Sequence, residues 1–470
     1  MFFRQYYLGC LSHASYLIGD TTTGRAVVVD PQRDVAEYVA DAESNGLRIE
    51  KVLETHFHAD FLSGHLELAA RTGATIGFGR AAAGRAEFPI ETFADGDRIV
   101  LGEVVLEVCE TPGHTPESIS VVIFDHGIDV DPYGVLTGDT LFIGDVGRPD
   151  LLASIGVTAD ELARKLYHSL HERLMVLPDA TKVLPAHGAG SACGKNLSTE
   201  TVSTIGEQRR TNYALAPMTE DEFVEAITQG QSVAPMYFSF AANRNRELRD
   251  LLRDDATVPA LSLDEVLAHQ AAGAMVVDGR DDVSFAAGHL RGSVNVGLGG
   301  RFAEYTGEVM TPGTPIVLVT DPGHEAEAKV RLARIGFDRV LGALRDPIEA
   351  FVTHAELVEQ LSRLSADTLA SRIASVPGLA LVDVRNPGEV ELGTMPGART
   401  ISLPSLLARM GELDRTAPTV VFCAGGYRSA IASSLLRAHG FSDVSDLVGG
   451  YTAWSAREES LASSSAGSTP

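Results

Sequence analysis

Short apolar runs alternate with stretches of helical spacing along residues 1 to about 240. The runs at residues 26–30, 104–108 and 120–124 have the length and the β-branched content of buried strands. From Ala159 onward, apolar residues recur at three- and four-residue spacing, which predicts a helix. This alternation indicates an α/β domain, which we expect to cover residues 1–245.

The rest of the chain carries an internal repeat. Residues 275–280 (Met-Val-Val-Asp-Gly-Arg) match residues 381–385 (Leu-Val-Asp-Val-Arg), so that Asp278 and Asp383 stand 105 residues apart. Each copy has the pattern strand, helix, strand, helix, strand, which is typical of an α/β unit with a largely parallel sheet. We therefore expect two further domains over residues 256–356 and 365–458, a polar linker at residues 243–255, and a disordered Ser-rich tail at residues 459–470.

Composition and charge exclude several classes of protein. The chain has 470 residues and is 44% hydrophobic and 21% charged, as expected for about three globular domains. No apolar run approaches the ~18 residues of a membrane-spanning helix, and the first residues lack the pattern of a secretory signal. A net charge of −25 disfavours binding to nucleic acid. The four cysteines are too few for a disulfide framework, so we expect a protein of the reducing cytoplasm.

Histidines and carboxylates follow several of the predicted strands in the first domain. A single histidine is most often a packed or surface residue, but a set of them at successive strand ends predicts convergence on a metal ion. The segment Thr55-His-Phe-His-Ala-Asp-Phe and three later loops supply His56, His58, Asp60, His114, Asp139 and His187.

This ordered set resembles the metallo-β-lactamase superfamily over roughly residues 1–215. The resemblance implies an αββα sandwich with the site at one edge between the two sheets. The family motif ends in histidine where this chain has Phe61, and dinuclear members such as glyoxalase II use that histidine for their second metal. We therefore expect one metal ion.

Resemblance to the persulfide dioxygenase branch implies that His56, His114 and Asp139 bind one Fe(II) per chain. Two histidines and one carboxylate leave three positions open, enough for O₂ and a substrate thiolate, whereas a hydrolytic zinc site commonly keeps one. His58, Asp60 and His187 would orient the ligands or hold water.

Two further residues are implicated by the same resemblance. Arg148 is in a segment like the one in which an arginine of persulfide dioxygenases faces the carboxylates of the thiol substrate. Cys193 lies six residues beyond the last histidine in a Gly-rich loop, so we expect it on the substrate side of the metal pocket. A structural arginine and a merely packed cysteine are the alternatives.

A strand, a Gly-rich loop and a helix follow one another around Cys423. The loop N–H groups, the helix dipole and Arg428 all favour a thiolate on this cysteine. The segment resembles rhodanese sulfurtransferases over about residues 365–456, which implies that Cys423 carries a persulfide. Its Cys-x4-Arg spacing is one residue shorter than the phosphate-binding loop of related phosphatases, so phosphatase activity is disfavoured. The residues expected to cradle the sulfur are Ala424, Gly425, Gly426, Tyr427 and Ser429.

The middle repeat keeps the pattern of this domain but lacks its nucleophile. Alignment places Thr320 at the position of Cys423, and no cysteine occurs between residues 194 and 422. It resembles an inactive rhodanese homology domain, retained as a spacer or a docking surface.

Together these features resemble the multidomain persulfide dioxygenase-sulfurtransferases of bacterial sulfide detoxification. The expected substrates are a thiol persulfide and O₂, with sulfite and thiosulfate exchanged at Cys423, and the resemblance suggests a dimer or a tetramer. Two alternatives stay open: a glyoxalase II-type zinc thioester hydrolase with an appended sulfurtransferase, and a sulfur carrier whose metal is structural.

Overall fold

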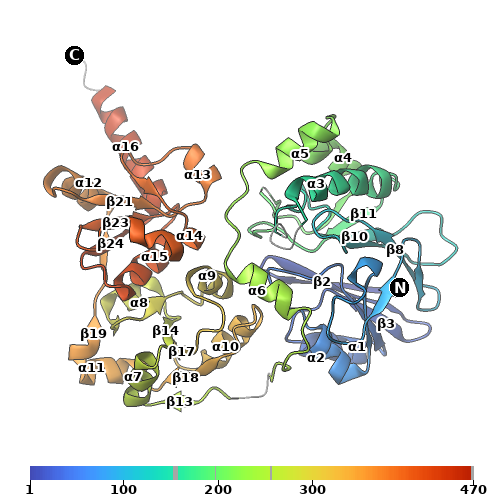
Figure 1. The fold of residues 1–470 in the computed structure, drawn as a ribbon, viewed down its shortest axis with the longest axis horizontal. Coiled ribbons are helices and arrows are strands. Elements are labelled where there is room, and N and C mark those ends of the chain that lie inside the picture. Colours follow the sequence, from blue (N-terminus) through green and yellow to red (C-terminus); the bar gives the residue numbers. More distant parts are fainter. Residues whose placement is uncertain (152–156, 196, 254–256, 467–470) are drawn as a thin grey trace. The chain divides into compact units, whose positions relative to one another are not determined.

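The computed structural model of the chain describes residues 1–151, 157–195, 197–253 and 257–466 (Figure 1). It divides into two units, Met1–Asp254 with Ala333–Gly336, and Asp255–Leu332 with Phe337–Pro470. Within the described ranges, no helix combines the length and the apolar character needed to cross a membrane.

Two six-stranded sheets face each other in the first unit (Figure 1). The layer between them is apolar, with Tyr16 and Val27 from one sheet meeting Leu106 and Val121 from the other. The first sheet has the order β1 (Phe2–Leu8), β2 (His13–Asp20), β3 (Arg25–Val29), β4 (Arg48–Leu53), β5 (Thr75–Gly79) and β6 (Glu91–Phe93). The second has the order β12 (Ser203–Thr204), β11 (Lys182–Pro185), β10 (Gly134–Gly138), β9 (Ile119–Phe124), β8 (Val105–Glu110) and β7 (Arg98–Val100).

Helices cover the outer face of each sheet. Tyr38 and Leu68, on α1 (Ala36–Ser44) and α2 (His65–Thr72), pack with strand residues of the first sheet. The second sheet is covered by α3 (Ala159–His168), α4 (Ile205–Thr211) and α5 (Glu220–Thr228), and α6 (Tyr237–Arg244) follows. The predicted αββα sandwich is confirmed. The predicted helix at Ala159 is also confirmed, and its first turn is fixed by a capping box between Thr158 and Glu161.

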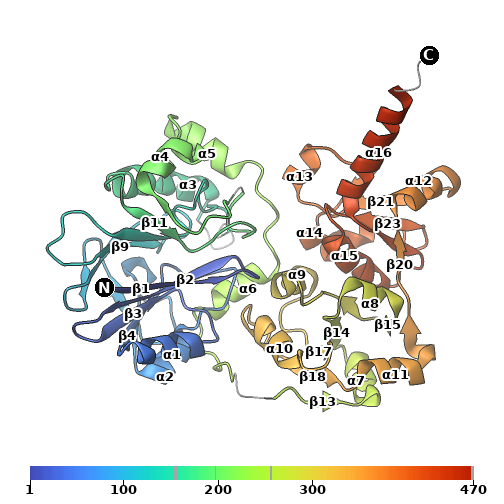
Figure 2. The ribbon, with the colours of Figure 1, turned by 180° about the vertical axis from the view of Figure 1, so that it is seen from behind.

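The second unit holds two parallel sheets with the same strand order, as the repeat predicts (Figure 2). The middle repeat has the order β13 (Ala260–Leu261), β18 (Val340–Leu344), β17 (Ile316–Val319), β14 (Met275–Asp278) and β16 (Val294–Asn295). The last repeat has the order β20 (Ser362–Leu364), β24 (Val444–Leu447), β23 (Thr419–Phe422), β21 (Ala380–Asp383) and β22 (Arg399–Thr400). A two-stranded antiparallel ribbon pairs β15 (His289–Leu290) with β19 (Val358–Glu359).

The helices of the two repeats also correspond. The middle repeat contains α7 (Leu263–Ala271), α8 (Asp282–Ala287), α9 (Phe302–Val309), α10 (Glu325–Ala333) and α11 (Pro347–Thr353). The last contains α12 (Ala366–Ser375), α13 (Pro387–Glu391), α14 (Leu403–Arg409), α15 (Tyr427–Ala438) and α16 (Gly450–Ala466).

The Asp-x-Arg signature of each repeat is a buried ion pair at the end of a central strand. Arg280 pairs with Asp278 at 2.6 Å and donates to the Gly288 carbonyl, and Arg385 pairs with Asp383 at 2.7 Å in the same manner. The pair ties the strand end to the chain that follows the next helix. The repeated motif therefore stabilises the scaffold of both copies.

Two expectations about the connecting segments are wrong. Within the predicted linker at residues 243–255, Asn245 and Arg249 are buried, and Arg249 pairs with the buried Glu67 of α2. These polar residues are therefore part of the first unit rather than a solvated connection. The predicted disordered tail begins as helix, because α16 continues to Ala466, while residues 467–470 lie outside the described residues.

Candidate functional site

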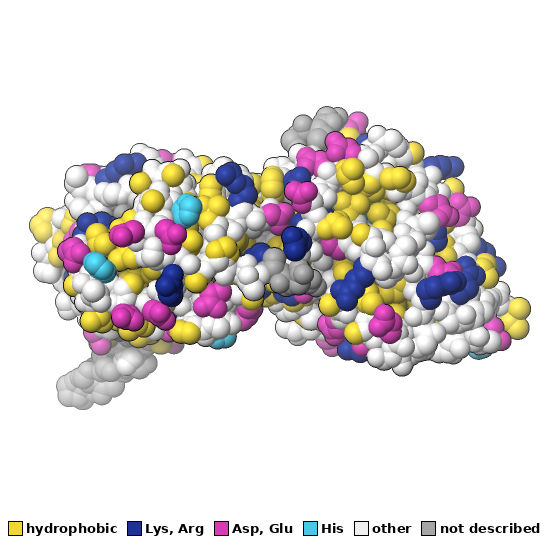
Figure 3. All heavy atoms as spheres, turned by 90° about the horizontal axis from the view of Figure 1, so that it is seen from below, with side chains coloured by type: hydrophobic (Ala, Val, Ile, Leu, Met, Phe, Trp, Pro, Cys, Tyr) yellow, Lys and Arg dark blue, Asp and Glu magenta, His cyan; other side chains and the backbone are white. Residues whose placement is uncertain are grey.

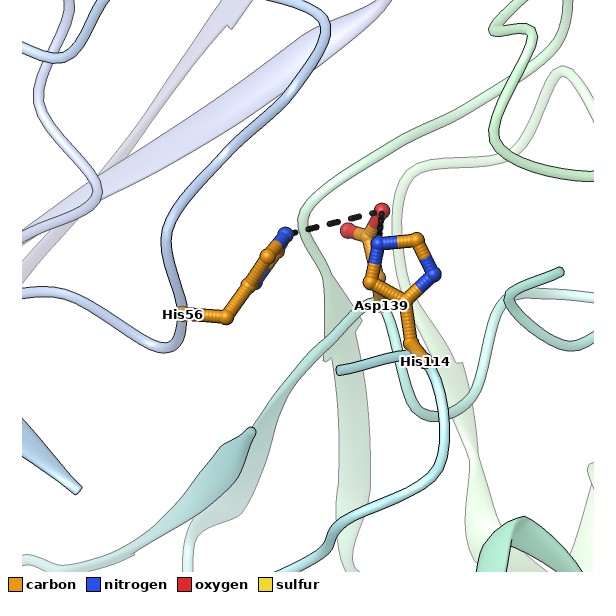
Figure 4. Close-up of side chains that lie close together, drawn as sticks. All are labelled: His56, His114 and Asp139. Carbon is orange, nitrogen blue, oxygen red and sulfur yellow. Dashed lines mark ion pairs between the residues drawn. The ribbon is translucent and has the colours of Figure 1, made fainter. Parts of the chain in front are cut away.

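Three side chains from separate loops of the first unit converge at one edge of the sandwich (Figure 4). His56 follows β4, His114 lies between β8 and β9, and Asp139 follows β10 directly. All three are buried, and their candidate ligand atoms lie within 4.8 Å of one another. Asp139 Oδ2 is 3.4 Å from His114 Nε2 and 4.0 Å from His56 Nε2. The arrangement is a two-histidine, one-carboxylate set that could hold a metal ion.

Each histidine of this set is oriented through its Nδ1 atom. His114 Nδ1 lies 2.9 Å from the Arg148 carbonyl oxygen, which can only accept, so this nitrogen carries the proton. His56 Nδ1 lies 3.0 Å from the Thr55 hydroxyl, which in turn donates to Asp30. Burial, with His58 and His114 nearby, holds the pKa of His56 well below its usual range. Both rings therefore point Nε2 toward the centre in the form that binds a metal.

The glycine before Arg148 makes this approach possible. A Cβ on Gly147 would lie 1.9 Å from the backbone oxygen of Asp139, so any side chain at position 147 would collide with the backbone of this candidate ligand. The absence of a side chain lets the backbone of residues 147–148 reach both Asp139 and His114.

The structure also brings His58, Asp60 and His187 together as a second buried group. His187 Nε2 is 3.2 Å from Asp60 and 3.4 Å from Asp139, so this group adjoins the first. His58 Nε2 lies 3.1 Å from Asp30. Burial lowers the pKa of His58, but Asp30 and Glu54 outweigh it and raise the pKa well above its ordinary value.

Arg148 and Cys193 lie beside the metal group but differ in what they contact. The Arg148 guanidinium is 2% exposed and forms a two-point ion pair with Asp150, with further bonds to the Ala192 and Ser232 carbonyls. In this conformation the N–H groups of the guanidinium bind other protein groups rather than facing a pocket. Cys193 Sγ groups with Asp139 and His187, and burial, followed by the nearby carboxylates, raises its thiol pKa.

Residues 423–429, for which the sequence predicts sulfur transfer and which we call the sulfur-transfer loop, lead from β23 into α15 in the last repeat. The sulfur of Cys423 is buried and accepts a 3.1 Å hydrogen bond from Gly426 N–H, and Ser429 Oγ is 3.6 Å away. The carbonyls of Cys423 and Ala424 accept from the backbone of Tyr451 and Thr452, which holds the loop from behind. The loop thus presents a backbone donor to the sulfur at the start of a helix.

The Arg428 side chain of this loop forms an ion pair with a carboxylate of the same repeat. Its guanidinium forms two hydrogen bonds, of 2.6 and 2.7 Å, with Glu389 of α13. The equivalent loop of the middle repeat follows β17 and begins at the buried Thr320, which has the same place after its strand as Cys423.

Two family descriptions match the sequence. Residues 8–187 match "Metallo-beta-lactamase superfamily", and residues 262–353 and 365–457 match "Rhodanese-like domain". The mitochondrial persulfide dioxygenase ETHE1 of Bos taurus is 32% identical over 233 residues, which span 49% of this chain and 82% of the relative. The chain belongs to the persulfide dioxygenase family. The Homo sapiens protein of the same name gives the same identity and the same coverage.

The family likeness extends to a solved structure. A metallo-beta-lactamase from Staphylococcus aureus is 32% identical, with a TM-score of 0.66, and the match covers 73% of this chain and 98% of that one. The likeness therefore reaches beyond the metal-binding unit. Within the persulfide dioxygenase family, this chain has two rhodanese-like domains after the metal-binding unit.

Phe61 makes an apolar contact beside the two candidate metal groups. Its buried ring lies 4.4 Å from the His58 ring and 3.9 Å from the ring of His13, a buried histidine that the sequence did not single out. A benzyl side chain offers no ligand atom, so the second group lacks one donor at this position.

The candidate metal site is also supported by Asn245, a residue of the segment predicted to be a linker. Asn245 donates from Nδ2 to the carbonyls of His58 and Phe61, each at 2.8 Å, and accepts from Ser63 N–H at 2.9 Å. These bonds fix the loop that carries His56. A buried polar residue in an apparently solvated stretch leaves no local pattern that identifies it.

Proposed function

We propose that the first unit is a non-haem Fe(II) persulfide dioxygenase. It oxidises a low-molecular-weight thiol persulfide with O₂ to sulfite and the free thiol, in the balanced reaction R–S–SH + O₂ + H₂O → R–SH + SO₃²⁻ + 2 H⁺. The observation that carries this proposal is the buried set His56, His114 and Asp139 in a member of the persulfide dioxygenase family.

The donor atoms of this set fit a cation. His56 Nε2 and both carboxylate oxygens of Asp139 are buried and have no hydrogen-bond partner among the described residues. Such atoms are costly in free energy unless an ion uses their lone pairs. We assign one Fe(II) per chain to them, because two imidazoles and one carboxylate are the ligand set of mononuclear iron oxygenases. A bound Fe(II) would activate O₂ and bind the persulfide sulfur.

The protein's own groups bury the ligands and orient the two imidazole rings. Thr55 and Asp30 fix the ring of His56, and the Arg148 carbonyl fixes the ring of His114. Cys193 lies at the side of Asp139 and His187, so we place the sulfur end of the substrate near it.

The last repeat is proposed to be the sulfurtransferase. Cys423 as a thiolate attacks the outer sulfur of a donor persulfide, the S–S bond of the donor breaks, and the departing thiolate takes a proton from water. Sulfite then attacks the outer sulfur on Cys423, which releases thiosulfate and restores the thiolate. Linking both sites in one chain raises the local concentration of sulfite at Cys423.

A thioester hydrolase is the second candidate for the first unit. The observation in its favour is the second buried group, His58, Asp60 and His187, which adjoins Asp139 as a second metal site would. Phe61 argues against it, since this side chain cannot be a ligand.

The charge and the cysteines of the chain bear on its binding partners and on the compartment in which it works. Acidic and basic side chains are interspersed on the face in Figure 3, and a chain of charge −25 repels a phosphate backbone. All four cysteines are free, which suits the reducing cytoplasm. We expect a dimer or a tetramer, to be measured by light scattering.

The deciding experiment is O₂ consumption with a thiol persulfide, on anaerobically purified protein assayed for iron and zinc. We expect about one iron per chain, the ratio that follows from our assignment of iron to His56, His114 and Asp139 alone, and uptake that depends on the persulfide. Two zinc ions per chain with no uptake would favour the hydrolase instead. The same assay on a panel of persulfides identifies the carrier thiol.

A further inference from the structure

The middle repeat contacts the sulfur-transfer loop of the last repeat within the second unit. Tyr427, the second residue before the cradle's Ser429, donates from its hydroxyl to the Gly297 carbonyl at 2.7 Å. Its ring lies 5.4 Å from the ring of Tyr305 on α9. One loop residue is therefore bound by the middle repeat through both its ring and its hydroxyl.

This contact is close enough to require a glycine. A Cβ on Gly300 would lie 2.5 Å from Tyr427 Cζ, a distance that real side chains do not reach. A Cβ on the neighbouring Gly299 would have no other heavy atom within 4 Å, so a methyl group there would meet open space. An alanine would therefore collide with Tyr427 at position 300 but not at position 299, so the two substitutions form a matched pair.

A second contact fixes the helix that follows the loop. The backbone N–H of Asn295, at the end of β16, donates to Ser434 Oγ on α15 at 2.9 Å. Tyr427 is the first residue of α15, and the preceding residue, Gly426, donates to the Cys423 sulfur. The position of Tyr427 therefore sets the direction of the Gly426 N–H, which donates to the sulfur.

We propose that residues 295–305 of the middle repeat are a positioning element of the sulfur-transfer site, which holds Tyr427 so that the Gly426 N–H points at the Cys423 sulfur. The inference rests on the proposed sulfurtransferase. It gives the middle repeat a task in that reaction although Thr320 replaces its own nucleophile.

The charged groups around the loop come from both repeats. α9 presents the buried Glu304 and Glu308, with Arg301 paired to Glu304. Arg428 of the last repeat acts on Glu308 through its charge and is itself paired with Glu389. None of these groups makes the bond to Gly297, so substitutions at Gly300 and at the Tyr427 hydroxyl test the contact without changing a charge.

The test compares Gly300→Ala, Tyr427→Phe and the control Gly299→Ala in the full-length protein. The readouts are the alkylation rate of Cys423 against pH, followed by mass spectrometry of its peptide, and kcat and KM for sulfur transfer. We expect Gly300→Ala and Tyr427→Phe to slow alkylation at pH 7 about three- to tenfold, as one weakened hydrogen bond to sulfur implies, and to move the pH profile upward. We expect kcat to fall more than KM changes, and Gly299→Ala to match the wild type.

Three outcomes separate the possibilities. If Gly300→Ala and Tyr427→Phe both follow Gly299→Ala in alkylation and in kcat, the proposal is overturned. If Gly300→Ala does not fold, Tyr427→Phe decides alone, because it removes only an oxygen atom. Alkylation needs no sulfur donor, so a shifted profile in a protein without transferase activity would support the positioning element and reject the proposed reaction at Cys423.

Discussion

Asn245 donates a 2.8 Å hydrogen bond to the backbone oxygen of His58, 187 residues earlier in the chain. The same amide holds Phe61, and its oxygen accepts from Ser63. The metal-binding loop is thus closed by a residue at the far end of the first unit.

Asn245→Ala should loosen this loop. Three buried hydrogen bonds are lost and two carbonyls lose a donor, so we expect the first unit to lose about 2 to 3 kcal/mol of unfolding free energy. Iron should also pass to a chelator faster than from the wild type. The control is Asn243→Ala, at an exposed position of α6 two residues earlier in the chain. Equal stability and equal iron retention in the two variants would contradict this assignment.

His114→Ala should remove the bound iron and abolish persulfide-dependent O₂ uptake. The reason is that only two ligands remain in the set, and the Arg148 carbonyl loses the imidazole that donates to it. Sulfur transfer from thiosulfate to a thiol should persist, because Cys423 belongs to the other unit. Metal analysis and an oxygen electrode measure the first effect. Unchanged uptake would show that the ligand set is wrong.

Cys423→Ser should abolish thiosulfate formation by transfer and leave O₂ uptake intact. A hydroxyl is a far weaker nucleophile than a thiolate and carries no persulfide. Thiosulfate and oxygen are followed in one reaction mixture. Loss of both activities would reject the division of the reaction between two sites.

Glu389→Gln should strengthen the binding of anionic substrates such as thiosulfate at the sulfur-transfer loop. The carboxylate of Glu389 occupies the two donors of Arg428 that would otherwise bind an oxyanion. Glutamine keeps the capping box of α13 but gives up the charge. We expect the KM for thiosulfate to fall several-fold, about what a charged hydrogen-bond partner contributes. A KM that rises would mean that the ion pair positions Arg428 for the substrate.

Glu308 makes the stability of the second unit depend on pH. Burial, and then the charge of Glu304, raises its pKa from 4.5 to about 8. The folded protein therefore keeps a proton that the unfolded chain releases above pH 4.5, so stability is fully present below that value and falls as the pH approaches 8. The slope is at most about 1.4 kcal/mol per pH unit. Glu308→Gln should flatten this decline in chemical unfolding curves, whereas a substitution of the exposed Glu349 should not.

The sequence predicted those parts of the structure that leave a local or a periodic signal. His56, His114 and Asp139 could be identified because each follows an apolar run. The two repeats could be identified because the same sequence pattern occurs twice. Asn245 left no such signal, since its partners are almost 200 residues away and its neighbours are polar. Arg428 shows a different limit: the spacing indicated a nearby cation, but only the fold shows that Glu389 binds it.

The matched pairs Asp278–Arg280 and Asp383–Arg385 bear on how such a chain evolves. A mutation that breaks the buried pair would leave an uncompensated buried charge and unfold the copy, whereas the middle repeat stays folded with Thr320 at the position of Cys423. Selection therefore removes the first kind of mutation and tolerates the second. A cysteine introduced at position 320 would accordingly enter a sound scaffold, but without the glycine pair and the arginine of the last repeat.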